Sequence, residues 1–322
     1  MRISKIFVQG MLIIVALQLL AVAVTVALTW APDRPLKTLV QRWAPAPSAF
    51  INIKGLSVHV RDEGRRDDPL PIVLLHGTSA SLHAWEGWVA ALKSERRVIT
   101  MDLPGFGLTG PNAQDDYRRP ATTQFILDLL DTLGVQRCVL GGHSVGGEIA
   151  WQVAAAAPQR VDRLILVDAG GYPTALPLVP IGLRVARMPG LERLMELTLP
   201  RSVIASGIRN EYGDPERVTP ALIDRYEELT LRAGNRHALG VRFAHTSTDA
   251  DNETNALRIK TLRLPTLILW GGRDKLLPMA HAQQFQQAIT GSQLMVFDDL
   301  GHVPHQEDAP RTVAAVKAFL KN

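Results

Sequence analysis

The sequence predicts an α/β fold with a doubly wound, mostly parallel sheet, and three observations lead to this prediction. Short apolar segments alternate along the chain with segments whose apolar residues recur at helical spacing. The short segments are apolar at consecutive positions, which is typical of strands buried on both faces. The chain has 322 residues, of which 46% are hydrophobic, so it is long enough to bury one large core. Such strands, separated by helices, form a parallel sheet covered on both faces.

Charge and cysteine content exclude several functional classes. The chain has 35 basic and 31 acidic residues, and Arg2 and Lys5 precede the domain, so residues 32–322 carry 33 basic against 31 acidic side chains. This slight excess is not the clustered basic surface that phosphate binding requires, so no nucleic-acid partner is predicted. Cys138 is the single cysteine, which excludes an intrachain disulfide and a zinc site built on several thiolates.

An apolar segment lies at the N-terminus. Residues 6–32 contain no charged side chain. A membrane span needs about 20 apolar residues, whereas the apolar part of a cleaved signal peptide has about 7 to 15. Residues 1–31 are therefore predicted to be an uncleaved anchor that enters the membrane through residues 6–30. A cleaved signal sequence and a buried core helix are the alternatives.

The orientation of this segment depends on the flanking charges. Arg2 and Lys5 precede the span, and Arg34, Lys37 and Arg42 follow it, so the two sides nearly balance. The expected orientation places the N-terminus inside and the domain on the periplasmic or another extracytoplasmic side.

The domain begins after a segment rich in proline. Residues 32–49 contain four prolines among polar residues and are predicted to form a stiff linker. From Phe50 on, the alternating segments 50–53 and 56–60 flank Lys54-Gly55, which predicts a β-hairpin.

Strands and helices then alternate. The predicted strands are residues 72–75, 98–101, 139–140, 164–167, 267–270 and 294–297. The predicted helices are residues 82–92, 122–133, 145–157, 280–289 and 309–320.

One long insertion interrupts this alternation. Residues 171–258 have no strand pattern and are too long for a connecting loop, so we expect a helical cap over the C-terminal edge of the sheet. The core is then residues 50–170 and 259–322. Within the cap, residues 181–199 mix apolar side chains with Arg184, Arg187 and Arg193. Packing onto the sheet and a lipophilic or interfacial surface both fit this pattern.

A serine follows the third strand of the parallel series. Gly142-His143-Ser144-Val145-Gly146 has the pattern Gly-x-Ser-x-Gly between a strand and a helix. A nucleophile on such a tight turn brings neighbouring backbone into contact, and only glycine fits two positions to either side. Ser144 is therefore the candidate nucleophile.

A serine hydroxyl needs a base, and the base needs a partner that orients it. His302 lies after the last predicted strand, and Asp274 lies just past the end of the preceding one. Both belong to the strand edge that carries Ser144, where ligands bind in open α/β sheets. The order Ser, Asp, His is the order of hydrolases with this turn. Asp168, at the end of another strand, is the alternative acid.

The strand at residues 72–75 is followed by His76-Gly77-Thr78. The backbone N–H groups of Thr78 and Val145 are predicted to form an oxyanion hole. His76 is expected to brace this loop through hydrogen bonds rather than to transfer protons.

Two motifs that suggest other ligands lack the context they need. Gly105-Phe106-Gly107-Leu108-Thr109-Gly110 matches a dinucleotide fingerprint, but Pro111 and a polar loop follow where a helix must begin. His302 and His305 are spaced like a metal pair, but no third ligand is evident. No cofactor and no metal are predicted.

Several stretches together resemble one known family. They are His76-Gly77, Asp102-Leu103-Pro104-Gly105-Phe106-Gly107, Gly142-His143-Ser144-Val145-Gly146-Gly147, Gly271-Gly272-Arg273-Asp274 and Gly301-His302. The chain resembles the α/β-hydrolase-fold family, in its esterase- and lipase-like branch, over residues 50–322. The resemblance implies Ser144 as nucleophile, His302 as base and Asp274 as acid. Relatives that act as dehalogenases or epoxide hydrolases use aspartate as nucleophile, and Ser144 argues against both.

The expected function is that of a membrane-anchored serine hydrolase. It would cleave a small-molecule carboxylic ester, with a lipophilic acyl chain, through an acyl-enzyme intermediate. The alternative is a carbon–carbon bond hydrolase that acts on ring-cleavage products. The stretch Ala169-Gly170-Gly171 resembles that branch of the family, but its members usually have a tryptophan after the catalytic histidine, where this chain has Val303. A lesser alternative is a non-catalytic ligand-binding member of the fold.

Overall fold

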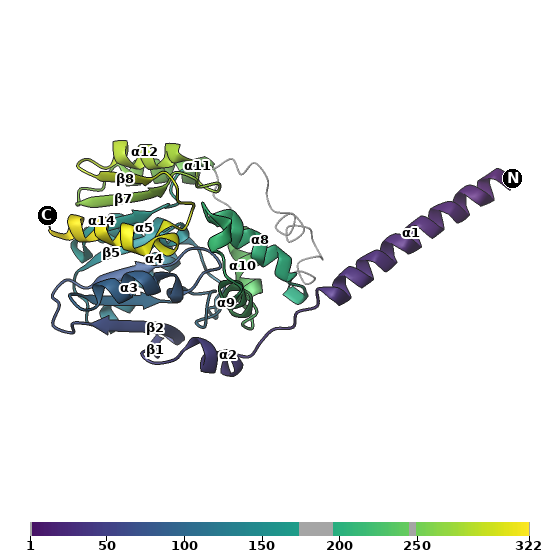
Figure 1. Cartoon of the computed structure of the whole chain (residues 1–322), viewed down its shortest axis with the longest axis horizontal. Coiled ribbons are helices and arrows are strands. Elements are labelled where there is room, and N and C mark those ends of the chain that lie inside the picture. Colours follow the sequence, from purple (N-terminus) through teal and green to yellow (C-terminus); the bar gives the residue numbers. More distant parts are fainter. Residues whose placement is uncertain (1, 174–195, 245–248, 322) are drawn as a thin grey trace.

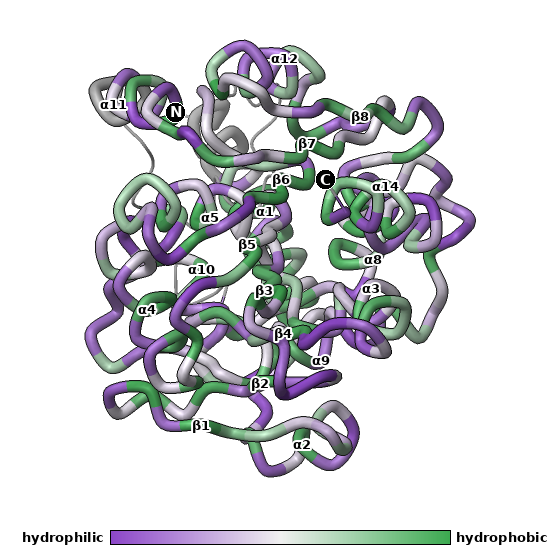
Figure 2. The backbone as a smooth tube through the Cα atoms, turned by 90° about the vertical axis from the view of Figure 1, so that its left-hand side faces the viewer, coloured by the Kyte–Doolittle hydropathy of each residue, from purple (hydrophilic) through white to green (hydrophobic). Residues whose placement is uncertain are grey.

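One eight-stranded sheet organises the computed structural model, which describes residues 2–173, 196–244 and 249–321. The strand order is β1-β2-β4-β3-β5-β6-β7-β8. Strands β1 and β8 lie toward opposite ends of the sheet in Figure 1, and Figure 2 labels every strand. The pairs β1–β2 and β2–β4 are antiparallel and all other pairs are parallel. The predicted α/β class with a mostly parallel sheet is confirmed.

The strands follow the apolar segments of the sequence closely. Their bounds are β1 Ala49–Ile53, β2 Leu56–Gly64, β3 Ile72–Leu75, β4 Arg97–Met101, β5 Cys138–His143, β6 Val161–Val167, β7 Thr266–Gly271 and β8 Gln293–Phe297. In β3, Ile72 and Leu74 belong to one apolar cluster, whereas Val73 and Leu75 belong to the other. A strand buried on both faces must be apolar at consecutive positions, which explains the pattern that predicted it.

Helices cover both faces of the sheet. Figure 2 shows α4 and α5 on one side of the strands and α3 and α14 on the other. The helices of the core are η1 Leu82–Trp85, α3 Glu86–Leu92, α4 Arg119–Thr132, α5 Val145–Ala156, η2 Pro158–Arg160, α12 Met279–Ala288, α13 Pro304–Glu307 and α14 Ala309–Lys321. The apolar clusters between sheet and helices fix the strand ends, and these ends carry the candidate site.

The insertion between β6 and β7 is helical in its described part. Its helices are α8 Arg201–Glu211, η3 Pro215–Arg217, α9 Pro220–Thr230, α10 Asn235–Ala244 and α11 Asp249–Ile259. Asn235 Nδ2 donates to the carbonyl of Gly107 at 2.9 Å, and Arg242 donates to the carbonyl of Pro104 at 2.6 Å. These contacts hold the cap over the loops at the C-terminal strand edge. The division of the chain into anchor, linker, core and cap stays a prediction.

Part of the predicted amphipathic segment cannot be placed. Residues 181–195, with Arg184, Arg187 and Arg193, lie outside the described residues.

Helix α1, Arg2–Leu28, extends away from the rest of the protein in Figure 1. Within it, Gln9–Leu28 has a mean hydropathy of 2.8 and none of it is buried. A buried core helix does not fit this arrangement. An anchor and a signal sequence both remain compatible with it.

The segment that follows α1 differs from the predicted stiff linker. Residues 32–49 contain helix α2, Leu36–Trp43, which packs on the protein. Leu36, Leu39 and Trp43 recur at helical spacing, and Leu39 is buried against Leu108 and Leu229. The Trp43 indole donates to the Glu228 carboxylate at 2.7 Å. The prolines of this segment therefore flank a docked helix.

Backbone hydrogen bonds also tie residues 29–34 to the cap. The Ala31 N–H donates to the carbonyl of Leu197 at 2.9 Å, and the Leu199 N–H donates to that of Thr29 at 3.0 Å. Arg34 bonds to the chain after α9 in the same way. The chain thus leaves α1 directly beside the cap.

We expect the docking of α2 to contribute to the stability of the domain. Leu39 is 1% exposed, so Leu39→Ala should lower the free energy of unfolding by about 2–5 kcal/mol, the usual cost of a buried leucine. Leu257, on α11, is 66% exposed, and Leu257→Ala is the matched control, with an expected change within about 0.5 kcal/mol. Urea unfolding of both variants measures the difference. Equal effects would mean that α2 is not docked in solution.

Candidate active site

Ser144 occupies a strained turn between β5 and α5. Its backbone φ is +53° and its ψ is −118°, a conformation that residues other than glycine rarely adopt. A Cβ atom added at Gly142 would collide with the carbonyl of Gly146, and one added at Gly146 would collide with the carbonyl of Leu75. Both positions therefore require glycine, which explains the Gly-x-Ser-x-Gly spacing physically.

His302 and Asp274 form a buried hydrogen-bonded pair. The Nδ1 atom of His302 lies 2.7 Å from Oδ2 of Asp274. The other carboxylate oxygen of Asp274 accepts hydrogen bonds from the backbone N–H groups of Leu276 and Leu277 at 2.7 and 3.0 Å. The His302 loop is held by the cap, because the His302 N–H donates to the carbonyl of Glu211 at 2.6 Å.

The two groups shift each other's protonation equilibria. Burial by itself raises the pKa of Asp274, but the hydrogen bond and charge of His302 and the two backbone N–H groups bring that pKa below its ordinary value. Burial by itself lowers the pKa of His302, but the hydrogen bond and charge of Asp274, with the charge of Glu211, raise it above its ordinary value. At neutral pH the Asp274 carboxylate is therefore ionised.

His143 connects Ser144 to the His302 loop. Its ring centroid lies 4.8 Å from that of His302, and its Nε2 atom lies 2.8 Å from the His302 carbonyl oxygen. In the described part of the chain, no hydrogen bond joins the Ser144 hydroxyl to the His302 ring. Such contacts often form only with substrate bound, so the pairing of nucleophile and base stays a prediction.

The predicted oxyanion hole has the required backbone groups near Ser144. A Cβ atom placed on Gly77 would lie 3.1 Å from Cβ of Ser144, so the loop that carries Thr78 approaches the serine closely. The Thr78 N–H donates to no group among the described residues. Val145 is the first residue of α5, where a backbone N–H has no acceptor within the helix. Both N–H groups are available to an anion.

His76 braces this loop, as predicted. Its Nε2 atom accepts a hydrogen bond from the Leu103 N–H at 3.0 Å, so its Nδ1 carries the proton and donates to the Gly77 carbonyl at 2.7 Å.

Asp168, the alternative acid, makes no hydrogen bond to His302 in the described structure. Its Oδ1 atom accepts from the Gly271 N–H at 2.9 Å. One carboxylate oxygen of Asp168, one of Asp274 and one ring nitrogen of His302 lie within 4.8 Å of one another. This spacing is close enough to suggest that the three atoms bind a cation. However, two of these atoms are only 2.7 Å apart, whereas ligands about 2.0–2.2 Å from one tetrahedral ion lie farther from each other. The group is better explained by hydrogen bonding.

Three residues near His302 were not predicted to belong to the site: Glu211, His305 and His143. Glu211, the last residue of α8, is half-buried; burial raises its pKa to about 7, with His302 opposing and Asp274 adding to this effect. His305 stacks between Trp85 and His143, with ring centroids at 4.3 and 4.5 Å. Burial and the charge of His302 lower the pKa of His305 to about 3, so this ring is neutral.

These three residues differ in how far the sequence could have indicated them. His143 occupies the first variable position of the serine motif, and His305 follows His302 at a spacing that suggested only a metal pair. Glu211 belongs to no motif, because the insertion has none.

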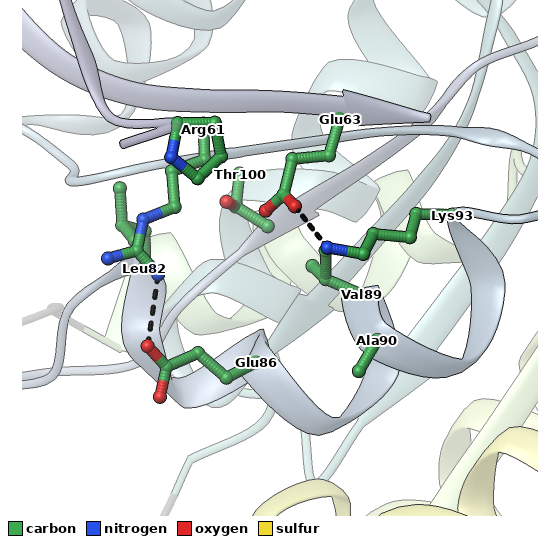
Figure 3. Close-up of a pocket in the computed structure, with 9 residues that line it drawn as sticks. Arg61, Glu63, Leu82, Glu86, Val89, Ala90, Lys93 and Thr100 are labelled. Atoms are coloured by element: carbon green, nitrogen blue, oxygen red, sulfur yellow. Dashed lines mark hydrogen bonds and ion pairs between the residues drawn. The ribbon is translucent and has the colours of Figure 1, made fainter. Parts of the chain in front are cut away.

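One cavity of the described structure lies away from this site. It has a volume of about 200 Å³ and lies between β2, β4 and α3 (Figure 3). Its charged side chains are paired, Arg61 with Glu86 at 3.0 Å and Lys93 with Glu63 at 2.7 Å.

A second crevice lies between the oxyanion loop and the cap. It is lined by Ser79, Gly105, Phe106, Gly107, Leu229, Thr230, Asn235 and Leu239. Its volume of about 10 Å³ is at the lower limit for one water molecule. The cap must therefore move before a substrate can occupy this crevice.

Comparison with known proteins identifies relatives over most of the chain. A family model described as alpha/beta hydrolase fold matches residues 71–309. An uncharacterized protein of Mycobacterium tuberculosis is 33% identical over 264 residues, which cover 77% of this chain and 74% of that protein. A 2-hydroxymuconate semialdehyde hydrolase of Pseudomonas sp. (strain CF600) is 26% identical over 284 residues, 86% of this chain and 95% of that enzyme.

Solved structures share the same architecture. The meta-cleavage product hydrolase of Pseudomonas fluorescens IP01, in a mutant form complexed with acetates, superposes with a TM-score of 0.70. The sequence identity is 25%, and the match covers 85% of this chain and 97% of that structure.

We predict that a fluorophosphonate probe labels Ser144 and no other serine, because Ser144 lies on the strained turn between β5 and α5, near the buried His302–Asp274 pair. Mass spectrometry of the labelled peptide identifies the site. Ser144→Ala should abolish labelling, and Ser206→Ala, which changes an exposed serine of α8, should not. The base must be neutral to accept a proton, so labelling should decline as the pH falls through the pKa of His302, which Asp274 and Glu211 raise above its ordinary value. Asp274→Asn should move this midpoint to lower pH. Labelling at another serine would contradict the assignment.

Proposed function

The chain belongs to the alpha/beta hydrolase fold family, and we propose that within it the protein is a serine hydrolase that cleaves a carboxylic ester through an acyl-enzyme intermediate. One observation carries this proposal: Ser144, at a φ of +53° on the β5–α5 turn, directly follows His143, whose ring lies 4.8 Å from that of His302, and His302 is hydrogen-bonded to Asp274 at 2.7 Å. A strained serine, an imidazole and a buried carboxylate are the groups that acyl transfer requires.

The acylation step follows from the tautomer of His302. Because Nδ1–H donates to Asp274, the neutral ring has its lone pair on Nε2. Nε2 takes the Ser144 proton as the serine oxygen attacks the ester carbonyl, and the imidazolium then gives this proton to the leaving alcohol. The N–H groups of Thr78 and Val145 bind the oxyanion, an interaction typically worth about 3–4 kcal/mol per donor. Water then attacks the acyl enzyme by the same route.

The surroundings of the site support a lipophilic acyl chain. Phe106, Leu229 and Leu239 line the crevice beside the oxyanion loop. On the His302 side, Val303 packs with cap residues that include Ile208 and Ile223 in a buried apolar cluster. An opened cap would offer these surfaces to a hydrocarbon chain.

Hydrolysis of a carbon–carbon bond is the second candidate function, because two of the matched proteins are named as hydrolases of ring-cleavage products. The matched proteins named as 2-hydroxymuconate semialdehyde hydrolase and meta-cleavage product hydrolase cover most of this chain. Two features favour the ester. Val303 takes the place of the tryptophan typical of the carbon–carbon branch. Glu211, with a pKa of about 7, places a carboxyl group that is partly ionised at neutral pH near His302, which disfavours an anionic substrate there.

A purely ligand-binding role is the least supported alternative. It would not require a strained serine or a buried Asp–His pair, and both cost folding free energy.

We also propose that α1 anchors the protein in a membrane, with the domain on the periplasmic or another extracytoplasmic side. The exposed apolar helix Gln9–Leu28 supports the anchor. Trp30 and Leu197 remain exposed where residues 29–31 meet the cap, and they would continue the apolar surface of the anchor onto the cap. A lipophilic substrate could then pass from the bilayer to the cap.

The ester activity is tested with p-nitrophenyl esters of increasing chain length, alongside 2-hydroxymuconate semialdehyde. We expect esters of medium or long acyl chains to be hydrolysed faster than acetate. His302→Ala and Asp274→Asn should each lower kcat at least about a thousandfold, while circular dichroism remains that of the wild type. Turnover of the semialdehyde without turnover of any ester would favour the second candidate.

The anchor is tested by extraction of membranes with alkaline carbonate. Full-length protein should remain in the pellet, because a span of about 20 apolar residues inserts effectively irreversibly. A chain that begins at Thr29 should be released and active, since it keeps the hydrogen bonds of Thr29, Ala31 and Arg34 to the cap. A chain that begins at Leu36 loses them and serves as the matched control, with lower stability expected. Full-length protein in the carbonate supernatant would contradict the anchor.

A further inference from the structure

The carboxyl groups of Asp168 and Asp274 lie close to each other and to the His302 ring. Asp168 follows β6 and is completely buried, and one of its oxygens lies within 4.8 Å of an Asp274 oxygen and a His302 ring nitrogen. Its φ is +41°, so its backbone adopts a conformation that favours asparagine, aspartate and glycine. The mechanism derived above uses Asp274 and gives Asp168 no part.

The hydrogen bonds of Asp168 are incomplete if it is ionised. Oδ1 accepts from the Gly271 N–H at 2.9 Å, whereas Oδ2 is buried without a donor in the described structure. No lysine or arginine of the described residues forms an ion pair with Asp168. An ionised Asp168 would thus be a second buried negative charge beside Asp274, with one oxygen unsatisfied.

A proton on Oδ2 removes both difficulties. We propose that Asp168 is held as a neutral carboxylic acid that donates its proton to the Asp274 carboxylate, so that the two groups share one negative charge and Asp168 is a positioning residue for the His302–Asp274 pair. This inference deepens the proposed function and rests on it for its effect on activity.

The surroundings decide which carboxyl keeps the proton. Asp274 accepts from the backbone N–H groups of Leu276 and Leu277 and from His302, which stabilises its ionised form. Asp168 accepts from a single N–H group. Burial, followed by the charge of Asp274, raises the pKa of Asp168 well above its ordinary value, in agreement with this asymmetry.

A neutral Asp168 limits how strongly the carboxyl groups raise the basicity of His302. Two ionised carboxylates below the ring would stabilise the imidazolium strongly and keep the base protonated at neutral pH. One shared charge, with Asp274 oriented by a further donor, leaves the ring free to act as a base. Among the described residues, the other titratable groups near this cluster are Glu307 of α13, Glu211 of the cap, His281 of α12, and the neutral rings of His143 and His305.

Asp168→Asn is the informative variant. Asparagine is neutral, can donate an N–H bond to Asp274, and tolerates the positive φ. Asp168→Ala removes the donor and is the matched comparison. The first readout is infrared absorption at neutral pH, where the C=O stretch of a protonated carboxyl lies apart from carboxylate bands. The second is the pH profile of kcat/KM on the best p-nitrophenyl ester.

The infrared measurement tests the protonation state without turnover. We expect the wild-type spectrum minus that of Asp168→Asn to contain one protonated carboxyl band. Absence of the band from the first difference would overturn the proposal, even if ester hydrolysis is observed. Presence of the band in a protein that hydrolyses no ester would uphold the protonation state and reject the proposed function instead.

The pH profile tests the positioning role. Asp168→Asn should keep kcat/KM within about threefold of the wild type and leave the acidic midpoint in place, because charge and donor are preserved. Asp168→Ala should lower kcat/KM at least about tenfold and raise the midpoint, because Asp274 loses a donor and becomes a stronger acceptor for His302. If Asp168 is instead ionised, Asp168→Asn removes a negative charge and lowers the midpoint by about one unit; that result would overturn the proposal. Should the alanine variant fail to fold, the asparagine variant alone decides between these outcomes.

Discussion

The buried hydrogen bond between His302 and Asp274 depends on how closely two loops at the end of the sheet approach each other. A Cβ atom on Gly271 would collide with the carbonyl of Gly301, so the loops after β7 and β8 meet backbone to backbone. Glu307 then fastens the second loop, because its carboxylate accepts hydrogen bonds from the N–H groups of Gly301, Gly213 and Asp214 at 2.8–3.0 Å. The position of the His302 imidazole is therefore set by the packing of these two loops and by the Glu307 carboxylate.

This constraint joins the cap to the chemistry. Gly213 and Asp214 belong to the insertion, and the Glu211 carbonyl accepts from the His302 N–H. The same insertion is held on its other side by residues 29–34 and by α2, through Leu39 and the Trp43–Glu228 hydrogen bond. The cap is thus a bridge between the segment that follows α1 and the loop that carries the base.

The sequence predicted those parts of the molecule that local rules determine. Strands such as Ile72–Leu75 were evident because burial on both faces requires apolar residues at every position. Ser144 was evident because its turn requires Gly142 and Gly146. The features that were not predicted depend on contacts between segments far apart in the sequence. The Glu211 carbonyl accepts a hydrogen bond from the His302 N–H. Helix α2 docks through contacts with Leu229 and Glu228. Proline content suggested a linker, whereas the apolar spacing of Leu36, Leu39 and Trp43 was the signal that would have identified a docked helix.

The contacts of the cap also determine how its opening would affect the base. Helices α9 and α10 are held by the buried Leu39, Leu108 and Leu229, and by the Asn235–Gly107 hydrogen bond, whose loss would leave polar groups buried. Helix α8 is joined to α9 by ion pairs of the exposed Arg201 with Asp224 and Glu227, which solvent screens. A buried apolar cluster that includes Ile208 and Ile223 also joins the two helices. Buried contacts therefore join the cap helices to one another as well as to the core. Because α8 ends at Glu211, whose carbonyl accepts from His302, a cap that opens along α8 also changes the surroundings of the base, so substrate entry and the basicity of His302 are physically coupled.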